Sequence, residues 1–333
     1  MNNKNILVTG GAGAIGSNLV KSLINNCNKL IILDDFSSGR YENVDGLINA
    51  TNVEIVDGNI CDQSVVDEAF SNDIDQVYHL AVNFANQNSV DNPEKDLTTN
   101  GIGIIKVLEA SVKNDIEKFL LSSSSCVYKP GKEAFVEHGP VELTTPYAIT
   151  KMLSEYYVTF FNKFHNLPAV IVRYFNSYGP GDIPGRFRGV VPNFLLRAMN
   201  GLPLQITGDG SETRPFTYVQ DIVDGTILAM NGDVNLSNSF SGHPIDKDNN
   251  IVYNIGNHKS VTILQFAELV NEVCGNSAGI EFVGRRDWDM FPNRSVDNEK
   301  AQKELDFKIN YDLTEGLELT YDWFKNQNFK LEN

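Results

Sequence analysis

The chain has 333 residues, a net charge of −16 and 41% hydrophobic residues, enough apolar material for one large or two modest globular domains. Nucleic acids and anionic membranes are bound by basic surfaces, so we expect neither as a partner of so acidic a chain. No apolar run approaches the length of a membrane span. The cysteines are far apart and form no CxxC pair, which favours reduced thiols in the cytoplasm over a zinc site or disulfide framework.

The first motif is a glycine-rich segment, Gly10–Gly16, between the apolar run Ile6–Val8 and residues typical of a helix. Glycines permit the backbone angles of a tight turn, and without a Cβ they let a pyrophosphate approach the first amides of the helix. A strand, a glycine turn and a helix start in this order predict a dinucleotide site. Tight turns without a ligand also carry several glycines, so the prediction depends on the segments after the turn.

Apolar strands then alternate with helical segments through the first half of the chain. Further strands are expected at Lys29–Asp34, Val53–Val56, Gln76–Leu80, Phe119–Leu121 and Ala169–Val172. Alternating βαβ units predict an α/β fold with a Rossmann-type, doubly wound parallel sheet. The Asn- and Ser-rich stretch Asn231–Asn250 is expected to be an extended surface loop.

Asp34 ends the second expected strand, where a carboxylate accepts hydrogen bonds from an adenosine ribose. Its charge would repel a 2′-phosphate, which favours NAD over NADP. NADP remains the alternative cofactor, because the guanidinium of the nearby Arg40 could accommodate the 2′-phosphate. The simpler alternative is that Asp34 and Asp35 only cap a turn.

A second pair of motifs carries the candidate chemistry. The serine run Ser122–Ser125 comes after the fifth strand, at the sheet edge where ligands bind. Thr145 and Pro146 then indicate a helix start that places Tyr147 and Lys151 one turn apart on one face. A neighbouring ammonium favours the phenolate, so the pair is an acid/base candidate. An ordinary amphipathic helix with a buried Tyr and a solvated Lys is the alternative.

Together these motifs resemble the extended short-chain dehydrogenases/reductases, in the nucleotide-sugar epimerase/dehydratase branch that includes UDP-glucose 4-epimerase-like proteins. The resemblance extends over nearly the whole chain. It rests on Thr9–Ser17, His79–Ala81, Asn100, Ser122–Tyr128, Tyr147 with Lys151, and Arg173–Pro180.

The resemblance implies NAD as the cofactor and a nucleotide-diphosphate sugar as the substrate. Tyr147 would be the base, Lys151 would lower its pKa, Ser124 would share the proton of the sugar hydroxyl, and Asn100 would support the lysine. The positions it assigns to the cofactor are Gly10, Gly13, Ala14, Ile15, Gly16, Asp34, Asp35, Ser37, Asn59, Ile60, Leu80, Ala81, Val82, Asn100, Ser122, Tyr147, Lys151 and Tyr174. The positions it assigns to the substrate are Ser124, Asn176, Asn193, Gln205, Arg214, Arg286 and Asp289.

The same resemblance implies an NAD-binding Rossmann domain over residues 1–176 and a smaller, mixed α/β nucleotide-sugar-binding domain over residues 177–333. Part of residues 215–260 would return to the first domain. Homodimerisation would pack two helices per subunit, at about 100–112 and 147–164, into a four-helix bundle. Apolar residues at helical spacing fit this interface, although core packing within one subunit also explains some of them: Ile104, Ile105, Leu108, Met152, Tyr156 and Phe160.

One departure from the family pattern bears on the reaction. Ser125 and Cys126 stand where 4,6-dehydratases of the family carry Asp-Glu and where decarboxylating members carry a Glu. Neither residue readily replaces a carboxyl group as acid or base. The expected reaction is therefore 4-epimerisation through a transient 4-keto sugar. A 4-dehydrogenase that releases the keto product is the alternative, and a non-catalytic NAD-binding scaffold is the third possibility. No role is assigned to four further arginines, Arg173, Arg186, Arg188 and Arg197.

Overall fold

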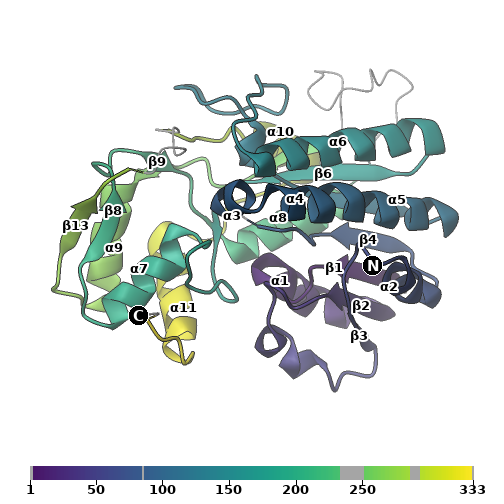
Figure 1. The fold of residues 1–333 in the computed structure, drawn as a ribbon, viewed down its shortest axis with the longest axis horizontal. Coiled ribbons are helices and arrows are strands. Elements are labelled where there is room, and N and C mark those ends of the chain that lie inside the picture. The colour runs from purple at the N-terminus through teal and green to yellow at the C-terminus, as the bar shows by residue number, and fades with distance from the viewer. Residues whose placement is uncertain (1–2, 85, 233–250, 286–292, 332–333) are drawn as a thin grey trace.

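The computed structural model describes residues 3–84, 86–232, 251–285 and 293–331. Its centre is a seven-stranded parallel sheet in the order β11–β6–β5–β4–β1–β2–β3 (Figure 1). The strands of this sheet are β1 (Asn5–Thr9), β2 (Lys29–Asp34), β3 (Val53–Asp57), β4 (Gln76–His79), β5 (Lys118–Ser124), β6 (Ala169–Tyr174) and β11 (Val252–Ile255). The strands predicted from the apolar runs all form. The one expected at Phe119–Leu121 is longer, because Ser122–Ser124 continue the pairing with β6.

Helices cover both faces of the sheet, as the continuous apolar strands require. Alternate residues of one strand enter different cores: Ile6 and Val8 face one side, and Leu7 faces the other. On the first side lie α1 (Ala14–Leu23), α8 (Val219–Asn231) and α10 (Glu299–Leu305). On the second side lie α2 (Gln63–Ala69), α5 (Ile104–Lys113) and α6 (Pro146–His165).

Three short helical segments join β4 to α5. They are α3 (Asn86–Asp91), α4 (Pro93–Leu97) and a π-helical stretch at Thr98–Gly103 that continues directly into α5. Because π-helical turns are rare and often occur at functional sites, this stretch marks the region for closer inspection.

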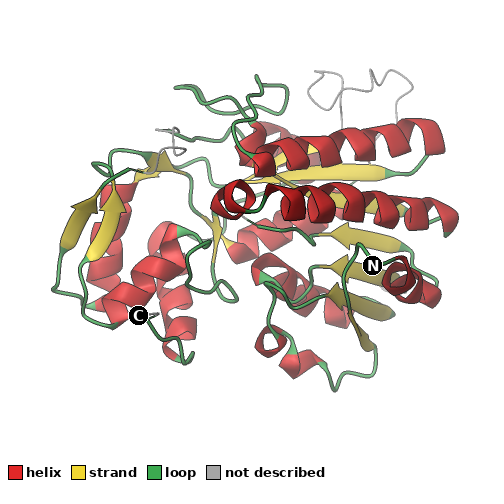
Figure 2. Ribbon diagram, in the orientation of Figure 1, coloured by secondary structure: helices red, strands yellow, loops and turns green. Residues whose placement is uncertain are grey.

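A smaller lobe lies beside the sheet and has its own apolar core. Figure 2 shows two adjacent strands at the outer edge of the lobe, with its helices between these strands and the large sheet. The lobe contains α7 (Val190–Met199), β8 (Leu204–Thr207), α9 (Ile263–Cys274), β13 (Ile280–Val283) and α11 (Leu313–Lys325). Short paired strands connect it to the sheet: β7 (Ser177–Tyr178), β9 (Thr213–Arg214), β10 (Thr217–Tyr218) and β12 (Val261–Thr262). Between these lobe elements, α8 and β11 belong to the large sheet and its helical cover.

The strand order reverses between β1 and β4, which are neighbours although two strands separate them in sequence. In doubly wound sheets such a switch point opens a crevice at the carboxyl ends of the strands, where ligands bind. In the described part of the chain, no helix is long and apolar enough to cross a membrane.

Candidate active site

A cavity of about 430 Å³ lies at this switch point. It is lined by every residue assigned to the cofactor from the sequence except Asn100. It is also lined by Ser124 and Asn176, and by the loop residues Arg186–Gly189 from the smaller lobe. The cavity therefore runs from the glycine turn, past the ends of β1, β4 and β5, to the start of α6.

The glycine turn has the shape that a dinucleotide needs. Gly10 has a φ of +71°, and a Cβ there would lie 2.6 Å from the backbone nitrogen of Ala81. A Cβ on Gly16 would lie 2.1 Å from the carbonyl oxygen of Gly10, so helix α1 packs closely against the turn. Gly13 precedes α1 and no described side chain caps the helix, which leaves amides of its first turn for a phosphate.

Asp34 lines the end of the cavity where an adenosine is expected and is only 8% exposed. Its carboxylate accepts hydrogen bonds from the amides of Ala12 (2.8 Å) and Phe36 (3.0 Å), which hold it in place. Burial raises the pKa of Asp34, and the two amide hydrogen bonds oppose that effect. Each oxygen keeps a further lone pair for a ribose hydroxyl. Arg40, which kept NADP open, forms an ion pair with Glu42 instead (3.2 Å).

Asp35, Ser37 and Asn59 form a second polar group beside Asp34. The Asp35 carboxylate accepts hydrogen bonds from the hydroxyl of Ser37 (2.6 Å) and the amide of Asn59 (2.7 Å). Asn59 also accepts a hydrogen bond from the amide of Cys61 (2.8 Å). These contacts fix the loop wall against which an adenine would pack.

The acid/base candidates meet at the other end of the cavity. Tyr147 and Lys151 are 5% and 4% exposed, and Ser124 is the last residue of β5. The Lys151 ammonium lies 5.9 Å from the centre of the Tyr147 ring and donates to the carbonyl oxygen of Ser122 at 2.8 Å. Helix α6 begins as predicted, since the Thr145 side chain accepts a hydrogen bond from the amide of Ala148 and Pro146 occupies the first turn. The strand end and the helix start thus place the three side chains together.

Burial controls the ionisation of these groups. It raises the pKa of the Tyr147 phenol, while a hydrogen bond with Ser124 acts in the opposite direction. It lowers the pKa of Lys151 to about 8, although the charges of Asp96, Glu155 and Cys126 oppose this effect. The phenol therefore needs a nearby positive charge to ionise near neutral pH, and Lys151 lies close enough to supply it.

The sequence did not single out Asp96, a buried carboxylate of α4. One of its oxygens accepts from Asn100 (2.9 Å) and the other from Thr150 (2.7 Å). Asn100 also donates to the hydroxyl of Thr150 (3.2 Å), and it is not among the described residues that line the cavity. Support of the lysine by Asn100 would act through Asp96, whose charge raises the pKa of Lys151 against the effect of burial. The signal that was available is the spacing of Asp96 and Asn100, one helical turn apart.

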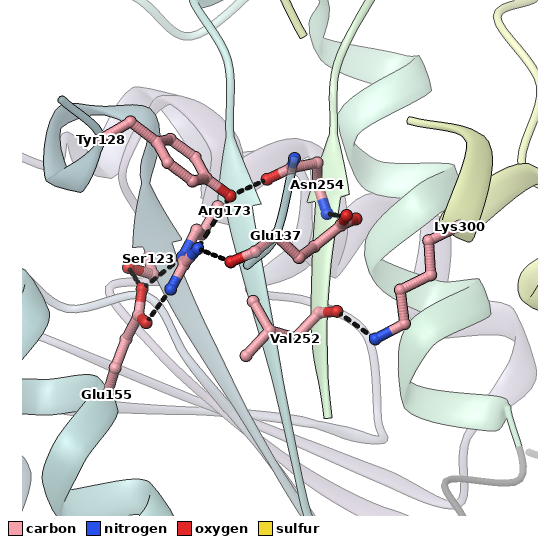
Figure 3. Close-up of polar contacts among 8 residues, drawn as sticks. All are labelled: Ser123, Tyr128, Glu137, Glu155, Arg173, Val252, Asn254 and Lys300. Carbon is pink, nitrogen blue, oxygen red and sulfur yellow. Dashed lines mark hydrogen bonds and ion pairs between the residues drawn. The ribbon is translucent and has the colours of Figure 1, made fainter. Parts of the chain in front are cut away.

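A second buried network lies behind the serine run (Figure 3). Arg173 of β6, which is completely buried, donates to both carboxylate oxygens of Glu155 on α6, at 2.9 and 2.6 Å. Glu155 also accepts from Ser123, and Arg173 donates to the hydroxyl of Tyr128 (2.8 Å). Burial alone would lower the pKa of Arg173, but Glu155 and Tyr128 raise it. The network fixes α6 against the ends of β5 and β6.

The residues assigned to the substrate do not all line the cavity. Asn176 lines the cavity with a φ of +41°, and its buried Oδ1 has no hydrogen-bond partner within the described residues. Such strain and an unpaired acceptor are typical of functional positions. Asn193 holds the loop before α7, because its side chain bonds to the carbonyl oxygens of Gly185 (3.1 Å) and Gly189 (3.0 Å).

Gln205 and Arg214 lie outside the cavity lining. Gln205 is exposed on β8, and Arg214 on β9 donates to the carbonyl oxygen of Thr213 (2.8 Å). Arg286 and Asp289 lie outside the described residues.

The structure also gives roles to the unassigned arginines. Arg173 belongs to the buried network, and Arg197 pairs with Glu281 (2.9 Å) in the smaller lobe. Arg186 and Arg188 line the mouth of the cavity. Arg186 pairs with Asp91 of α3 (3.0 Å), and Arg188 donates to Ser38 beside the adenosine end (2.8 Å). The loop therefore bridges both sides of the opening.

Comparison with known proteins places this site in a family. An epimerase of Methanothermobacter thermautotrophicus is 41% identical, with a TM-score of 0.87 over 97% of this chain and 93% of that one. A UDP-glucose 4-epimerase of Thermotoga maritima, solved with UDP-glucose, is 33% identical, with a TM-score of 0.87 over 96% and 98%. A UDP-N-acetyl-alpha-D-glucosaminuronate decarboxylase of Bacillus cytotoxicus is 32% identical over 97% of this chain and 98% of its own.

The family profile matches residues 6–256, which include the glycine turn, Asp34 and the Tyr147–Lys151 pair. The glycine turn and the buried carboxylate of Asp34 fit the cofactor of that family, which is NAD. The relatives perform more than one reaction, so the likeness fixes the family and the cofactor and leaves the reaction open. The chain belongs to the NAD dependent epimerase/dehydratase family.

Proposed function

We propose that the protein is an NAD-dependent nucleotide-sugar 4-epimerase. The observation that carries this proposal is the composition of the reacting end of the cavity. Ser124, Tyr147 and Lys151 line it, while the acidic residues of the described lining, Asp34, Asp35 and Asp182, belong to other parts of the cavity. Groups that exchange a proton with a hydroxyl are present, and among the described lining residues no carboxyl group accompanies them.

The residues of the chain would act on the 4-hydroxyl of the sugar. NAD, when bound, would supply the hydride acceptor and donor for this exchange. Tyr147 takes the hydroxyl proton, Ser124 hydrogen-bonds to the same oxygen, and the charge of Lys151 stabilises the phenolate. When the 4-keto sugar has turned its other face to the cofactor, Tyr147 gives the proton back and the hydroxyl has the opposite configuration.

The alternative reactions of the family need carboxyl groups that the described residues of this end do not supply. Elimination of water requires an acid for the leaving hydroxyl and a base for a carbon-bound proton. Ser125 and Cys126 occupy the 3₁₀ turn after β5 where the dehydratases that this chain resembles carry carboxyl groups. This supports exchange at one carbon over dehydration or decarboxylation.

A screen of sugar nucleotides by mass spectrometry and NMR tests the proposal. We expect an isomer of equal mass and inverted C4 configuration, with no net NADH measured by absorbance. Stoichiometric NADH and a 4-keto product would instead identify a dehydrogenase. Absence of turnover with every sugar nucleotide would favour a non-catalytic scaffold.

We also propose that Arg214 and Arg286 hold the diphosphate of the substrate, opposite the start of α7. Charge-assisted contacts of this kind contribute roughly 1.5–3 kcal/mol each. Replacing either arginine with Ala should weaken sugar-nucleotide binding by that amount and leave NAD affinity unchanged, as measured by calorimetry. Unchanged sugar-nucleotide affinity in both variants would remove the clamp.

A homodimer is the assembly that we propose. Exposed apolar residues follow one side of α6: Ile149, Tyr156, Phe160 and Phe164. Of the residues expected at the interface, Ile104, Leu108 and Met152 instead face the core of the subunit. Light scattering should report a dimer, and Phe160→Glu should produce a monomer because it places a charge on this apolar side. A parent chain that is monomeric at micromolar concentration would contradict the proposal.

A further inference from the structure

The loop over residues 181–189 leads from β7 to α7 and brings two arginines to the cavity lining, Arg186 and Arg188. Their partners differ. Arg186 forms an ion pair with the carboxylate of Asp91 (3.0 Å). Arg188 instead donates to the hydroxyl and to the carbonyl oxygen of Ser38, at 2.8 and 3.0 Å. A carboxylate therefore compensates the charge of Arg186, whereas neutral oxygens hold Arg188.

The loop is fixed at both of its ends. At its start the carbonyl oxygen of Pro180 accepts a hydrogen bond from Asn18 of α1 (2.7 Å). A Cβ on Gly181 would lie 2.9 Å from the hydroxyl oxygen of Ser17, so the chain runs directly against the first turns of α1. At its end the side chain of Asn193 holds backbone groups of the loop. The protein itself thus positions the loop and its arginines.

Ser38 lies between the end of the cavity where an adenosine is expected and the glycine turn. A Cβ on the next residue, Gly39, would lie 2.8 Å from an oxygen of the Asp34 carboxylate. The residue after it, Arg40, donates its backbone amide to the carbonyl oxygen of Ala12 in the glycine turn (3.1 Å). The segment that holds the Arg188 guanidinium therefore connects the carboxylate expected at the ribose with the turn that leads into α1.

A bound dinucleotide has its diphosphate between these two places. The diphosphate follows the adenosine ribose, and in doubly wound folds it lies at the amides that begin the first helix. No described side chain caps those amides of α1, but amides carry only partial charges. A guanidinium has a full charge and binds phosphate oxygens with two N–H groups. Arg188 is therefore placed and suited to bind the diphosphate.

One acid is near enough to interact with the charge of Arg188. Burial raises the pKa of Asp182 to about 6, and the charge of Arg188 opposes that rise. The two side chains form no ion pair in the described part of the chain, although both line the cavity. An anion bound beside Asp182 would be repelled by its carboxylate, and the cation of Arg188 offsets that repulsion.

We propose that Arg188 binds the diphosphate of NAD, so that a loop next to the smaller lobe supplies part of the cofactor site. Ser38 holds the guanidinium in place, and its own hydroxyl hydrogen can be donated to the same phosphates. Neither residue is among the cofactor positions assigned from the sequence. The inference concerns the cofactor only and does not depend on which reaction the protein catalyses.

Calorimetry on the full chain, freed of nucleotide, tests the inference with three ligands. NAD contains the diphosphate, adenosine has the same base and ribose without a phosphate, and UDP, added with NAD at saturation, reports on the proposed substrate site. In Arg188→Gln the affinity for NAD should fall at least about tenfold, while the affinities for adenosine and UDP stay unchanged. Arg188→Lys should keep part of the NAD affinity, because it retains the charge but loses the fork.

Arg186→Gln is the matched control, because Arg186 lines the same cavity two positions away but is already paired with Asp91. It should leave the three affinities within about twofold of the parent values. Should the chain be unstable without a nucleotide, the release of NADH from the loaded chain gives the same comparison. Its rate, followed by fluorescence after addition of excess NAD, should rise at least about tenfold in Arg188→Gln and stay unchanged in Arg186→Gln.

Unchanged NAD affinity and unchanged NADH release in Arg188→Gln would overturn the inference. An equal loss of adenosine affinity would also overturn it, because Arg188 would then shape the cavity rather than bind phosphate. The same holds for an equal loss of NAD affinity in Arg186→Gln. A loss of UDP affinity in place of NAD affinity would assign the cation to the diphosphate of the substrate instead. None of these outcomes bears on 4-epimerisation, which the screen of sugar nucleotides decides.

Discussion

Two buried cations, Lys151 of helix α6 and Arg173 of the neighbouring strand β6, have pKa values that are shifted in opposite directions. Arg173 donates to both oxygens of Glu155, and its pKa is raised. Lys151, one turn before Glu155 on the same helix, donates to the carbonyl oxygen of Ser122, and burial lowers its pKa to about 8. One charge is fully compensated by a carboxylate in contact, and the other is not.

The difference indicates a structural role for Arg173 and a chemical role for Lys151. A compensated pair has no charge left for a ligand, so Arg173 and Glu155 fix the distance between α6 and the strand ends (Figure 3). Lys151 keeps its charge for the phenol and for the ligands of the cavity. The carboxylates that could neutralise it, Asp96 and Glu155, instead accept from Thr150, Asn100 and Arg173. The Arg173–Glu155 pair thus holds helix α6 in place, and the helix in turn positions the ammonium of Lys151.

The largest expected effect is a loss of turnover when Tyr147, the residue beside Lys151, is changed. Tyr147→Phe removes the proton acceptor, so turnover should fall by about 10²- to 10⁴-fold. The free energy of unfolding should change little, because the ring still packs edge-on against Phe84. Steady-state kinetics and urea denaturation measure the two quantities. Full activity would reject Tyr147 as the base, and weakened NAD binding would show that the hydroxyl has a further role in holding the cofactor.

A change in the Arg173–Glu155 pair should mainly lower the stability of the fold. Arg173→Met leaves the Glu155 carboxylate buried without its cation, and the free energy of unfolding should fall by about 3–5 kcal/mol. Replacing both partners, Arg173→Met with Glu155→Leu, should be less destabilising than the single change, because no charge remains buried. Urea denaturation of the two variants gives the comparison. If the double variant is the less stable one, the pair is more than a compensated charge.

The sequence predicts the residues of the reacting site but not the buried residues that hold them. The glycine turn, Asp34, and Tyr147 with Lys151 were predictable because local periodicity and cap residues place them at strand ends and on one helix face. The buried partners were not, because Asp96 and Arg173 come from segments far apart in the sequence. Their contacts depend on the tertiary arrangement of α4, α6 and β6. Helical spacing left open whether Ile104, Leu108 and Met152 meet a partner or the core, because spacing alone does not say which apolar side meets the sheet; the structure buries all three.

The smallest expected effect concerns the titration of Lys151 through Asp96. The charge of Asp96 raises the pKa of Lys151 against the effect of burial, and Glu155 and Cys126 act in the same direction. Asp96→Asn removes one of these charges, so the pKa of Lys151 should fall further below about 8. Lys151 then loses its proton at a lower pH and no longer favours the phenolate. The alkaline limb of the pH–activity profile should move to lower pH, by about one unit.

Glu94→Gln is the control for that shift, because Glu94 is exposed on the same short helix and should leave the limb where it is. A structural role of Asp96 alone would lower activity at every pH without moving the limb, since Asn still accepts from Thr150 but carries no charge. The pH dependence of kcat for the three proteins therefore decides the question. A limb that stays in place in Asp96→Asn, or moves to higher pH, would mean that the charge on α4 does not act on Lys151.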